Sequence, residues 1–217
     1  MKTKNKTDHG FPEIKALLRL KLVKRIKPAA ALDLYAGEGK MLAAVAPAFN
    51  RMIAVEKDPH KFIKLCRQVE NNIPHMRTHC MDNLRFVKTC LPELEGINYI
   101  DLDAYGCPNR LVGEIFKSWR PAVKTAFAVT DGGRICLSRG NRMRPGDYFP
   151  ENGRDGPAGH AENTVRLPPG LVRDYELLVK NFWKTLAGRY GFRVVDYLSV
   201  WKKARRVLYY GVCIEPD

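Results

Sequence analysis

The stretch that decides the fold is residues 29–39, which read AAALDLYAGEG. A short apolar run contains the acidic Asp33, and a Gly-x-Gly turn made by Gly37 and Gly39 follows within a few residues. A strand that leads through glycines into a helix is typical of nucleotide-binding α/β folds, because glycine lets the backbone approach a ligand closely. An ordinary strand–helix turn fits the same letters, so the neighbouring segments must decide.

Beyond this turn, short apolar runs alternate with segments of helical periodicity. We expect strands at residues 29–35, 51–56, 75–80, 97–101 and 124–130, and helices at residues 41–49, 59–73, 83–89, 111–119 and 171–189. Two closely spaced β-rich runs, 192–200 and 206–214, predict an antiparallel hairpin at the end of the chain. The alternation predicts an α/β fold: a doubly wound, Rossmann-like and mostly parallel sheet with helices on both faces.

The chain divides into a basic start and one folded domain. Residues 1–28 hold an amphipathic helix, expected at 14–26. Three leucines are expected to face inward from this helix: Leu17, Leu18 and Leu22. Residues 29–217 are expected to form the domain. Residues 139–170, rich in Gly, Pro, Arg and Asn and without periodicity, are expected to be a functional loop or a plain surface insertion.

Composition places the chain among globular proteins. Of its 217 residues, 45% are hydrophobic and 28% charged, which excludes bulk disorder and collagen. The six cysteines contain no Cys-x-x-Cys pair, so we expect neither a metal site nor disulfides, but reduced thiols in a cytoplasmic protein. We expect no membrane span and no secretory signal, because no run reaches about 20 apolar residues and the basic N-terminus has no apolar core.

The net charge of +14 is concentrated in two places. Residues 1–27 contain nine Lys or Arg against two Asp or Glu, and the hexapeptide 201–206 contains four Lys or Arg. Such clusters attract nucleic-acid phosphates, although a solvated, solubilising surface explains the charge equally well. Six candidate nucleic-acid contacts are Lys202, Lys203, Arg205 and Arg206 from the hexapeptide, and Arg142 and Arg144 from the long loop.

Polar side chains follow the next two predicted strands. Glu56 ends the second strand, and Asp82 and Asn83 follow the third. The carboxyl ends of parallel strands meet at one edge of the sheet, where open α/β sheets bind ligands. An acid after the second strand can accept both hydroxyls of a ribose, and polar groups after the third can contact an adenine edge. The sequence therefore predicts a nucleotide-type cofactor beside the glycine turn.

The motif at residues 33–39, followed by acids after the second and third strands, resembles that of class I S-adenosylmethionine-dependent methyltransferases over about residues 29–214. It lacks the further glycine of a dehydrogenase fingerprint. The resemblance implies a seven-stranded sheet with an antiparallel last strand, and S-adenosyl-L-methionine as the cofactor. Its glycines approach the methionine part of the cofactor, and its acids hold the ribose and the adenine. The residues assigned to the cofactor are Asp33, Tyr35, Gly37, Gly39, Glu56, Asp82 and Asn83.

A second polar motif ends the fourth strand, where residues 99–108 read YIDLDAYGCP. Asp101 and Asp103 lie two residues apart on a strand and therefore face the same side, where mutual repulsion tends to raise one of their pKa values. A carboxylate that accepts the hydrogens of an exocyclic amine favours its nucleophilic form, and an aromatic ring can stack on a base. We therefore expect Asp103, Tyr105 and Asp101 to be catalytic, although two acids that cap a turn beside a packed tyrosine fit the same letters.

This second motif is similar to that of the tRNA guanine N2-dimethyltransferase family, which carries Asp-x-Asp-Pro-Phe-Gly-x-Pro at the same strand end and Thr-Asp-Gly after the next strand. Thr130-Asp131-Gly132 matches the latter here, whereas Ala104 replaces the family's proline. The resemblance implies that Asp103 holds the amino group of guanine and that Tyr105 lines the base pocket.

Together these features predict an enzyme that transfers a methyl group from S-adenosylmethionine to a nucleobase amino nitrogen, with RNA as the preferred substrate. Three other functions stay open: amino methylation of DNA, a non-catalytic cofactor-binding subunit that binds nucleic acid, and methylation of a small molecule. The small loop at 139–170 argues against readout of a DNA sequence, and the positive charge argues against a small-molecule substrate. The replacement of proline by Ala104 keeps the non-catalytic alternative open.

Overall fold

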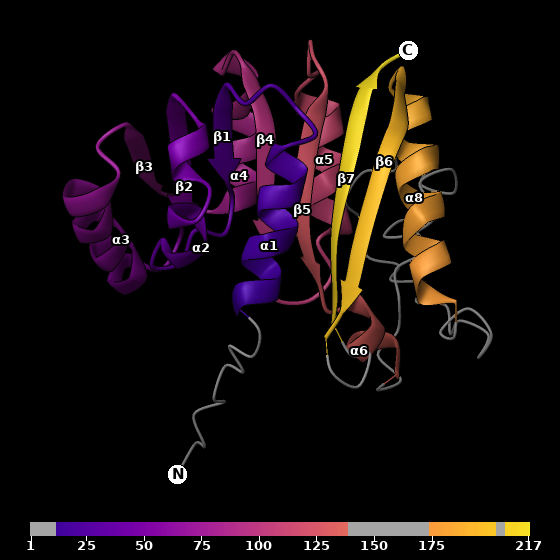
Figure 1. The fold of residues 1–217 in the computed structure, drawn as a ribbon, viewed down its shortest axis with the longest axis horizontal. Coiled ribbons are helices and arrows are strands. Elements are labelled where there is room, and N and C mark those ends of the chain that lie inside the picture. The colour runs from indigo at the N-terminus through magenta and orange to yellow at the C-terminus, as the bar shows by residue number, and fades with distance from the viewer. Residues whose placement is uncertain (1–11, 139–173, 203–206) are drawn as a thin grey trace, which may run out of the picture.

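The computed structural model describes residues 12–138, 174–202 and 207–217 (Figure 1). They form one seven-stranded sheet in the order β3-β2-β1-β4-β5-β7-β6. The strands are β1 (Ala30–Asp33), β2 (Arg51–Glu56), β3 (Met76–Cys80), β4 (Ile97–Asp103), β5 (Thr125–Asp131), β6 (Phe192–Trp201) and β7 (Leu208–Pro216). The helices are α1 (Pro12–Val23), α2 (Lys40–Ala43), α3 (Pro59–Asn72), α4 (Asn83–Thr89), α5 (Asn109–Ser118), α6 (Gly133–Ser138) and α8 (Tyr175–Arg189), with 3₁₀ turns η1 (Ala46–Ala48) and η2 (Leu91–Glu93).

The pairing of the strands confirms the predicted sheet. β1 to β5 run parallel, and β7 lies between β5 and β6 and pairs antiparallel with both. The chain proceeds outward from β1 to β3 and then returns to place β4 on the other side of β1. This reversal between β1 and β4 is a topological switch point, the position at which open α/β sheets bind ligands beyond the carboxyl ends of their strands.

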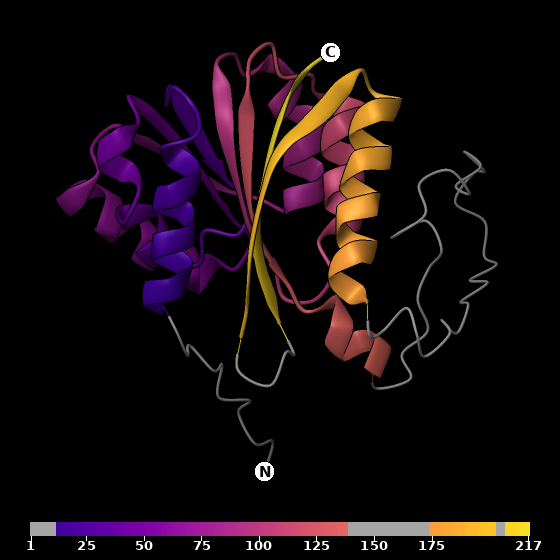
Figure 2. The same cartoon turned by 45° about the vertical axis from the view of Figure 1, so that its right-hand side comes forward.

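Helices cover both faces of the sheet, as the turned view in Figure 2 shows. On one face α1, α2 and α3 bury apolar side chains such as Leu22 and Leu42. On the other face α4, α5 and α8 cover an aromatic cluster, in which the ring centroid of Phe127 lies 6.0 Å from that of Phe116 and 4.9 Å from that of Trp183. Because each aromatic side chain buries about 150–250 Å², this cluster is a main source of stability for the second face.

The apolar stripe of α8 follows the predicted helical period. Tyr175, Leu178, Phe182 and Leu186 are all buried. The first residues of the predicted helix, 171–173, lie outside the described residues, as does the predicted loop at 139–170. Neither α8 nor any other helix in the described ranges is long and apolar enough to span a membrane.

Helix α1 packs directly on the sheet rather than beside it. Leu22 lies so close to Gly211 of β7 that a Cβ atom added at this glycine would stand 2.4 Å from the Leu22 Cδ1 atom. Leu18 and Leu22 are buried as predicted, but the prediction for Leu17 is wrong, because its side chain is 57% exposed. The buried face of α1 includes Arg19, which forms an ion pair with an acid of the sheet, and Leu17 lies on the side of the helix opposite this face.

The predicted helix at 41–49 is shorter in the structure. It divides into α2, which has one turn, and the 3₁₀ turn η1. Pro47 lies in the first part of η1. A proline has no backbone N–H to donate to the preceding turn and its ring collides with that turn, so the α-helix cannot continue through this position.

Candidate active site

Most of the predicted site residues meet at the carboxyl edge of the parallel strands, the edge at which α6 lies in Figure 1. Asp33 ends β1, Glu56 ends β2 and Asp103 ends β4. Each acid is therefore fixed by the strand that precedes it, and the parallel register brings strands from distant parts of the sequence together. Asp33 pairs with Asp101 in the register of β1 and β4.

Glu56 joins the glycine turn to the end of β2. Its Oε2 atom accepts a hydrogen bond from the Gly37 amide at 2.9 Å, and its Oε1 atom accepts one from the Asp58 amide at 2.8 Å. The side chain is buried. A carboxylate has about four lone-pair directions, so two remain for hydroxyl donors such as those of a ribose.

The glycines of the turn have a backbone that other residues rarely adopt. Gly39 has φ of 84° and begins α2. A Cβ atom added there would stand 2.9 Å from the Leu65 Cδ1 atom of α3. The turn therefore needs glycine both for its left-handed conformation and for its close approach to the neighbouring helix.

Tyr35 and Asn83 connect the ends of β1 and β3. The Tyr35 hydroxyl is hydrogen-bonded to the Asn83 side chain, and burial raises the pKa of that hydroxyl. Asp82 is the N-cap of α4, and its Oδ1 atom accepts hydrogen bonds from the Leu84 and Arg85 amides at 3.0 and 3.2 Å. An acid at this position thus has a structural role as a helix cap, alongside the predicted contact with an adenine.

Asp101 forms a buried ion pair with Arg19. The guanidinium Nε lies 2.5 Å from Oδ2 and Nη2 lies 2.8 Å from Oδ1, so the contact is bidentate. Burial raises the pKa of Asp101, and the Asp103 charge adds to the rise, while Arg19 opposes it. Burial and the Asp101 charge raise the pKa of Asp33 well above its usual value. Because removal of one partner from a buried pair costs about 3–5 kcal/mol, Arg19 is a main support of this acidic group.

Asp103 forms an ion pair with Lys15, which lies on α1, the helix that also carries Arg19. The Lys15 Nζ atom lies 2.6 Å from Oδ1 and 2.9 Å from Oδ2 of Asp103. Burial alone would raise the pKa of Asp103, but the charges of Arg19 and Lys15 outweigh it and hold the pKa below its usual value. The expected pair of acids facing one side is thus present, with one pKa raised and the other lowered.

Tyr105 points away from the protein at the end of β4. Its side chain is 78% exposed, and the Lys61 Nζ atom lies 5.9 Å from its ring centroid. The turn that carries it is held in place because the Gly106 carbonyl accepts a hydrogen bond from the Gly132 amide after β5. An exposed ring on a backbone turn that is held in this way is available for stacking with a planar group.

Ala104 closes the turn in a way that proline cannot. Its amide donates a hydrogen bond to the Leu102 carbonyl at 2.9 Å, and its side chain is buried. Proline has no backbone N–H to donate. The turn between Asp103 and Tyr105 is therefore held by a backbone hydrogen bond, at the position where the tRNA guanine N2-dimethyltransferase motif has a proline.

Sequence reasoning missed the roles of Lys15 and Arg19. The signal was present, because the two residues are four apart and therefore share a helix face, and Arg19 lies next to the buried Leu18. The sequence also indicated no role for Asp131, which accepts hydrogen bonds from the Gly133 amide at 2.7 Å and the Tyr175 hydroxyl at 2.8 Å. Burial raises the pKa of Asp131 to about 6.

Most of the predicted nucleic-acid contacts are not described by the structure. Lys202 is described, and its amide donates a hydrogen bond to the Val207 carbonyl at 2.9 Å. The other five candidates lie outside the described residues: Arg142, Arg144, Lys203, Arg205 and Arg206. Within the described ranges no group of three or more His, Cys, Asp or Glu side chains could hold a metal ion.

Comparisons with known proteins support the fold. No family model and no curated protein matches the sequence. Among solved structures, Trm1 from Pyrococcus horikoshii in complex with S-adenosyl-L-methionine matches 95% of this chain and 56% of its own, with a TM-score of 0.69 and 14% identity. TYW2 from M. jannaschii in complex with AdoMet matches 92% of this chain and 76% of its own (TM-score 0.56, 14% identity). Trm5b from Pyrococcus abyssi matches 91% of this chain and 47% of its own (TM-score 0.55, 12% identity). The chain therefore has the fold of the class I S-adenosylmethionine-dependent methyltransferases.

Proposed function

We propose that this protein is an S-adenosylmethionine-dependent methyltransferase that acts on an exocyclic amino nitrogen of a nucleobase in RNA. The observation that carries the proposal is the position of Asp103. A carboxylate held ionised at the end of β4, one strand away from the glycine turn after β1, can accept hydrogen bonds from an amino group presented beside the cofactor. The fold neighbours bound to this cofactor support the methyltransferase part of this proposal.

The residues around the glycine turn fit the cofactor. Glu56 is a buried carboxylate with two lone-pair directions left after its backbone contacts, which suits the two ribose hydroxyls. Gly37 and Gly39 leave the backbone open to the methionine part of the cofactor, and Asp33 at the end of β1 and Tyr35 two residues later flank it. When bound, S-adenosylmethionine supplies a methyl group on a positively charged sulfur. The remaining cofactor contacts that we propose are those of Asp82 and Asn83 with the adenine.

The chain's own contribution to the reaction is positioning. In the proposed site Asp103 accepts the hydrogens of the amino group and turns the nitrogen lone pair toward the methyl donor. Asp101, held by Arg19, fixes the end of the strand that carries Asp103. Tyr105 stacks on the base, because its ring is exposed and its turn is fixed by the loop after β5.

The basic charge of the chain favours RNA as the acceptor. The net charge of +14 suits a polyanion, whose phosphates gain affinity from released counterions. The fold neighbours include Trm1, TYW2 and Trm5b. We propose that the hexapeptide 201–206 and the arginines of the 139–170 loop bind RNA phosphates, while the acids at the sheet edge contact the cofactor and the base.

The proposal is tested by incubating the protein with S-adenosylmethionine labelled in its methyl group and, in separate reactions, total RNA, total DNA and total protein. We expect label in RNA and little in the other two. Label in DNA alone would replace RNA by DNA as the acceptor. Binding of the cofactor without transfer to any nucleic acid would refute the catalytic assignment and favour a binding subunit.

A further inference from the structure

We propose that Lys15 is a positioning residue of this site: its ammonium group holds Asp103 as an ionised hydrogen-bond acceptor in one fixed orientation. The inference rests on the proposed function, because it assigns Lys15 a role in presenting the acceptor amine. Lys15 lies outside the segment whose motifs resemble methyltransferases, and no motif in the sequence points to it.

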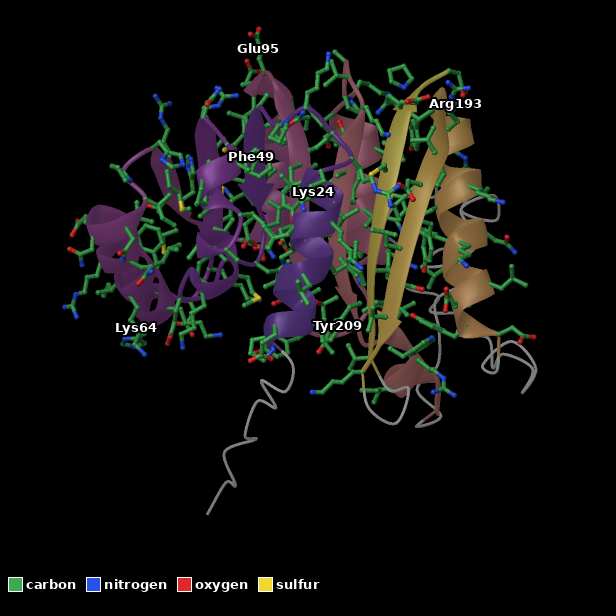
Figure 3. All side chains as sticks on the ribbon, in the orientation of Figure 1. Lys24, Phe49, Lys64, Glu95, Arg193 and Tyr209 are labelled. Carbon is green, nitrogen blue, oxygen red and sulfur yellow. The ribbon has the colours of Figure 1, made fainter. Side chains whose placement is uncertain are left out.

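The contacts of Lys15 hold its ammonium between a carboxylate and an aromatic ring. The Nζ atom contacts both oxygens of Asp103, at 2.6 and 2.9 Å, and lies 5.1 Å from the ring centroid of Tyr209 on β7. Figure 3 shows Tyr209 beside the N-terminal part of α1, at the carboxyl edge of the parallel strands. The side chains of Lys15 and Asp103 are only 18% and 22% exposed, so solvent weakens the pair less than it weakens a surface ion pair.

The docking of α1 determines where this ammonium lies. Leu22, two turns after Lys15, packs against Gly211 of β7, and Arg19 binds Asp101 in between. A helix seated at both of these points has little freedom to slide or turn. Lys15 is thus held over the end of β4 by the fold itself, which is what a positioning residue requires.

The charged and polar groups around Asp103 come from four elements. Lys15 and Arg19 from α1 favour its ionised form, with Arg19 Nη2 4.0 Å from Asp103 Oδ2. The Asp103 charge in turn raises the pKa of Asp101 on β4 and of Asp33 on β1. The Thr130 side chain, the register partner on β5, also favours the ionised form. Without Lys15, two buried acids and one arginine would remain, and the balance would move toward a protonated Asp103.

The chemistry of amine methylation explains why ionisation matters. A carboxylate has about four lone-pair directions; Lys15 uses one on each oxygen and leaves others for the hydrogens of the amine. As the bond from nitrogen to the methyl carbon forms, the carbon–sulfur bond breaks and its electron pair stays on sulfur. The nitrogen then loses one proton to water. Asp103 with a lowered pKa accepts hydrogen bonds throughout this step but does not take the proton, so it is ready for the next acceptor without having to titrate.

The experiment compares wild type with Lys15→Met, which keeps a linear side chain only one heavy atom shorter but removes the charge. Lys117→Met is the matched control, because it also removes a lysine–carboxylate ion pair, with Glu114, from an exposed site on α5. Two quantities are measured: the pKa of Asp103, from the carboxyl carbon signal assigned with Asp103→Asn, and the pH profile of kcat/KM for methyl transfer. Lys15→Arg tests rescue by a second cation.

In Lys15→Met we expect the pKa of Asp103 to rise by about one unit or more. The acidic limb of the kcat/KM profile should move to higher pH by the same amount. At neutral pH Asp103 stays ionised, and kcat should fall about tenfold because the carboxylate loses its fixed orientation. Lys15→Arg should restore most of both, and Lys117→Met should match wild type. An unchanged Asp103 pKa in folded Lys15→Met, or a changed pKa with unchanged turnover, would overturn the inference while wild-type activity keeps the proposed function. If the wild type transfers no methyl group at all, the proposed function fails and this role falls with it.

Discussion

The amide nitrogen of Gly37 lies 2.9 Å from Oε2 of Glu56, so the turn after β1 is hydrogen-bonded to the acid that ends β2. The other oxygen of Glu56 accepts the amide of Asp58. The Glu56 carboxylate, which would hold the ribose, therefore also fixes the position of the backbone that would approach the methionine part of the cofactor.

Glu56→Gln should weaken cofactor binding. Only one of the two terminal atoms of glutamine can accept, so one backbone hydrogen bond is lost together with the charge. Hydrogen bonds to charged groups contribute about 1.5–3 kcal/mol, so the Kd for S-adenosylmethionine in titration calorimetry should rise about 10- to 100-fold. Glu70→Gln, on the exposed side of α3, is the control and should bind like wild type. Equal affinity in both variants would remove Glu56 from the cofactor site.

Two glycine substitutions should have opposite effects on stability. Gly39→Ala places a Cβ atom at φ of 84° and 2.9 Å from Leu65, so we expect the free energy of unfolding to fall by about 1–3 kcal/mol. Gly113→Ala lies inside α5 with nothing within 4 Å of the added atom, and it should leave stability unchanged or raise it by up to about 1 kcal/mol. Denaturant unfolding measures both. A Gly39→Ala variant as stable as wild type would contradict the left-handed turn.

Asp131 should make stability depend on pH. Its pKa is raised by burial from 3.8 to about 6, so the folded state binds more protons than the unfolded state between these values. The free energy of unfolding therefore falls as pH rises from about 4 to about 6, by about 3 kcal/mol for this group. Asp131→Asn lacks this titration, so its stability relative to wild type should increase by about that amount between pH 4 and pH 7.

The control for this pH effect is Asp174→Asn, an exposed acid at the start of α8 whose side chain makes no cap hydrogen bond. Because surface substitutions change the free energy of unfolding by about 0.5 kcal/mol or less, its difference from wild type should be small at both pH values. If the difference between Asp131→Asn and wild type is also constant with pH, Asp131 is not the buried titrating group described above.

Neutralisation of the hexapeptide 201–206 should weaken RNA binding but not cofactor binding. The substituted residues are Lys202, Lys203, Arg205 and Arg206. The slope of the logarithm of the binding constant against the logarithm of salt concentration should become shallower. The change in slope should be as much as about 3 if all four residues contact phosphates of single-stranded RNA. A control set neutralises four lysines on α4, α5 and α8: Lys88, Lys117, Lys180 and Lys184. If cofactor affinity falls together with RNA affinity, the cluster is structural.

The sequence predicted the parts of this molecule that depend on local pattern. The strands follow from short apolar runs and the buried stripe of α8 from a period of 3.6 residues, and acids at strand ends meet because parallel strands share an edge. The partners Lys15 and Arg19 could not be predicted in the same way. They contact Asp103 and Asp101 across more than 80 residues, and their position depends on how α1 turns on β7. Leu17 was predicted incorrectly because it lies on the side of α1 opposite Leu22, and the buried face is completed by an arginine, which apolar periodicity does not count.

The role of Asp103 in amine methylation is tested by mass spectrometry of the nucleosides from RNA that has been incubated with S-adenosylmethionine and wild type, Asp103→Asn or Asp174→Asn. We expect a nucleoside methylated on its exocyclic amine with wild type and Asp174→Asn. With Asp103→Asn the product should fall by at least about 100-fold while S-adenosylmethionine still binds. Methylation on ribose, on carbon or on a ring nitrogen, or equal product from Asp103→Asn, would contradict it.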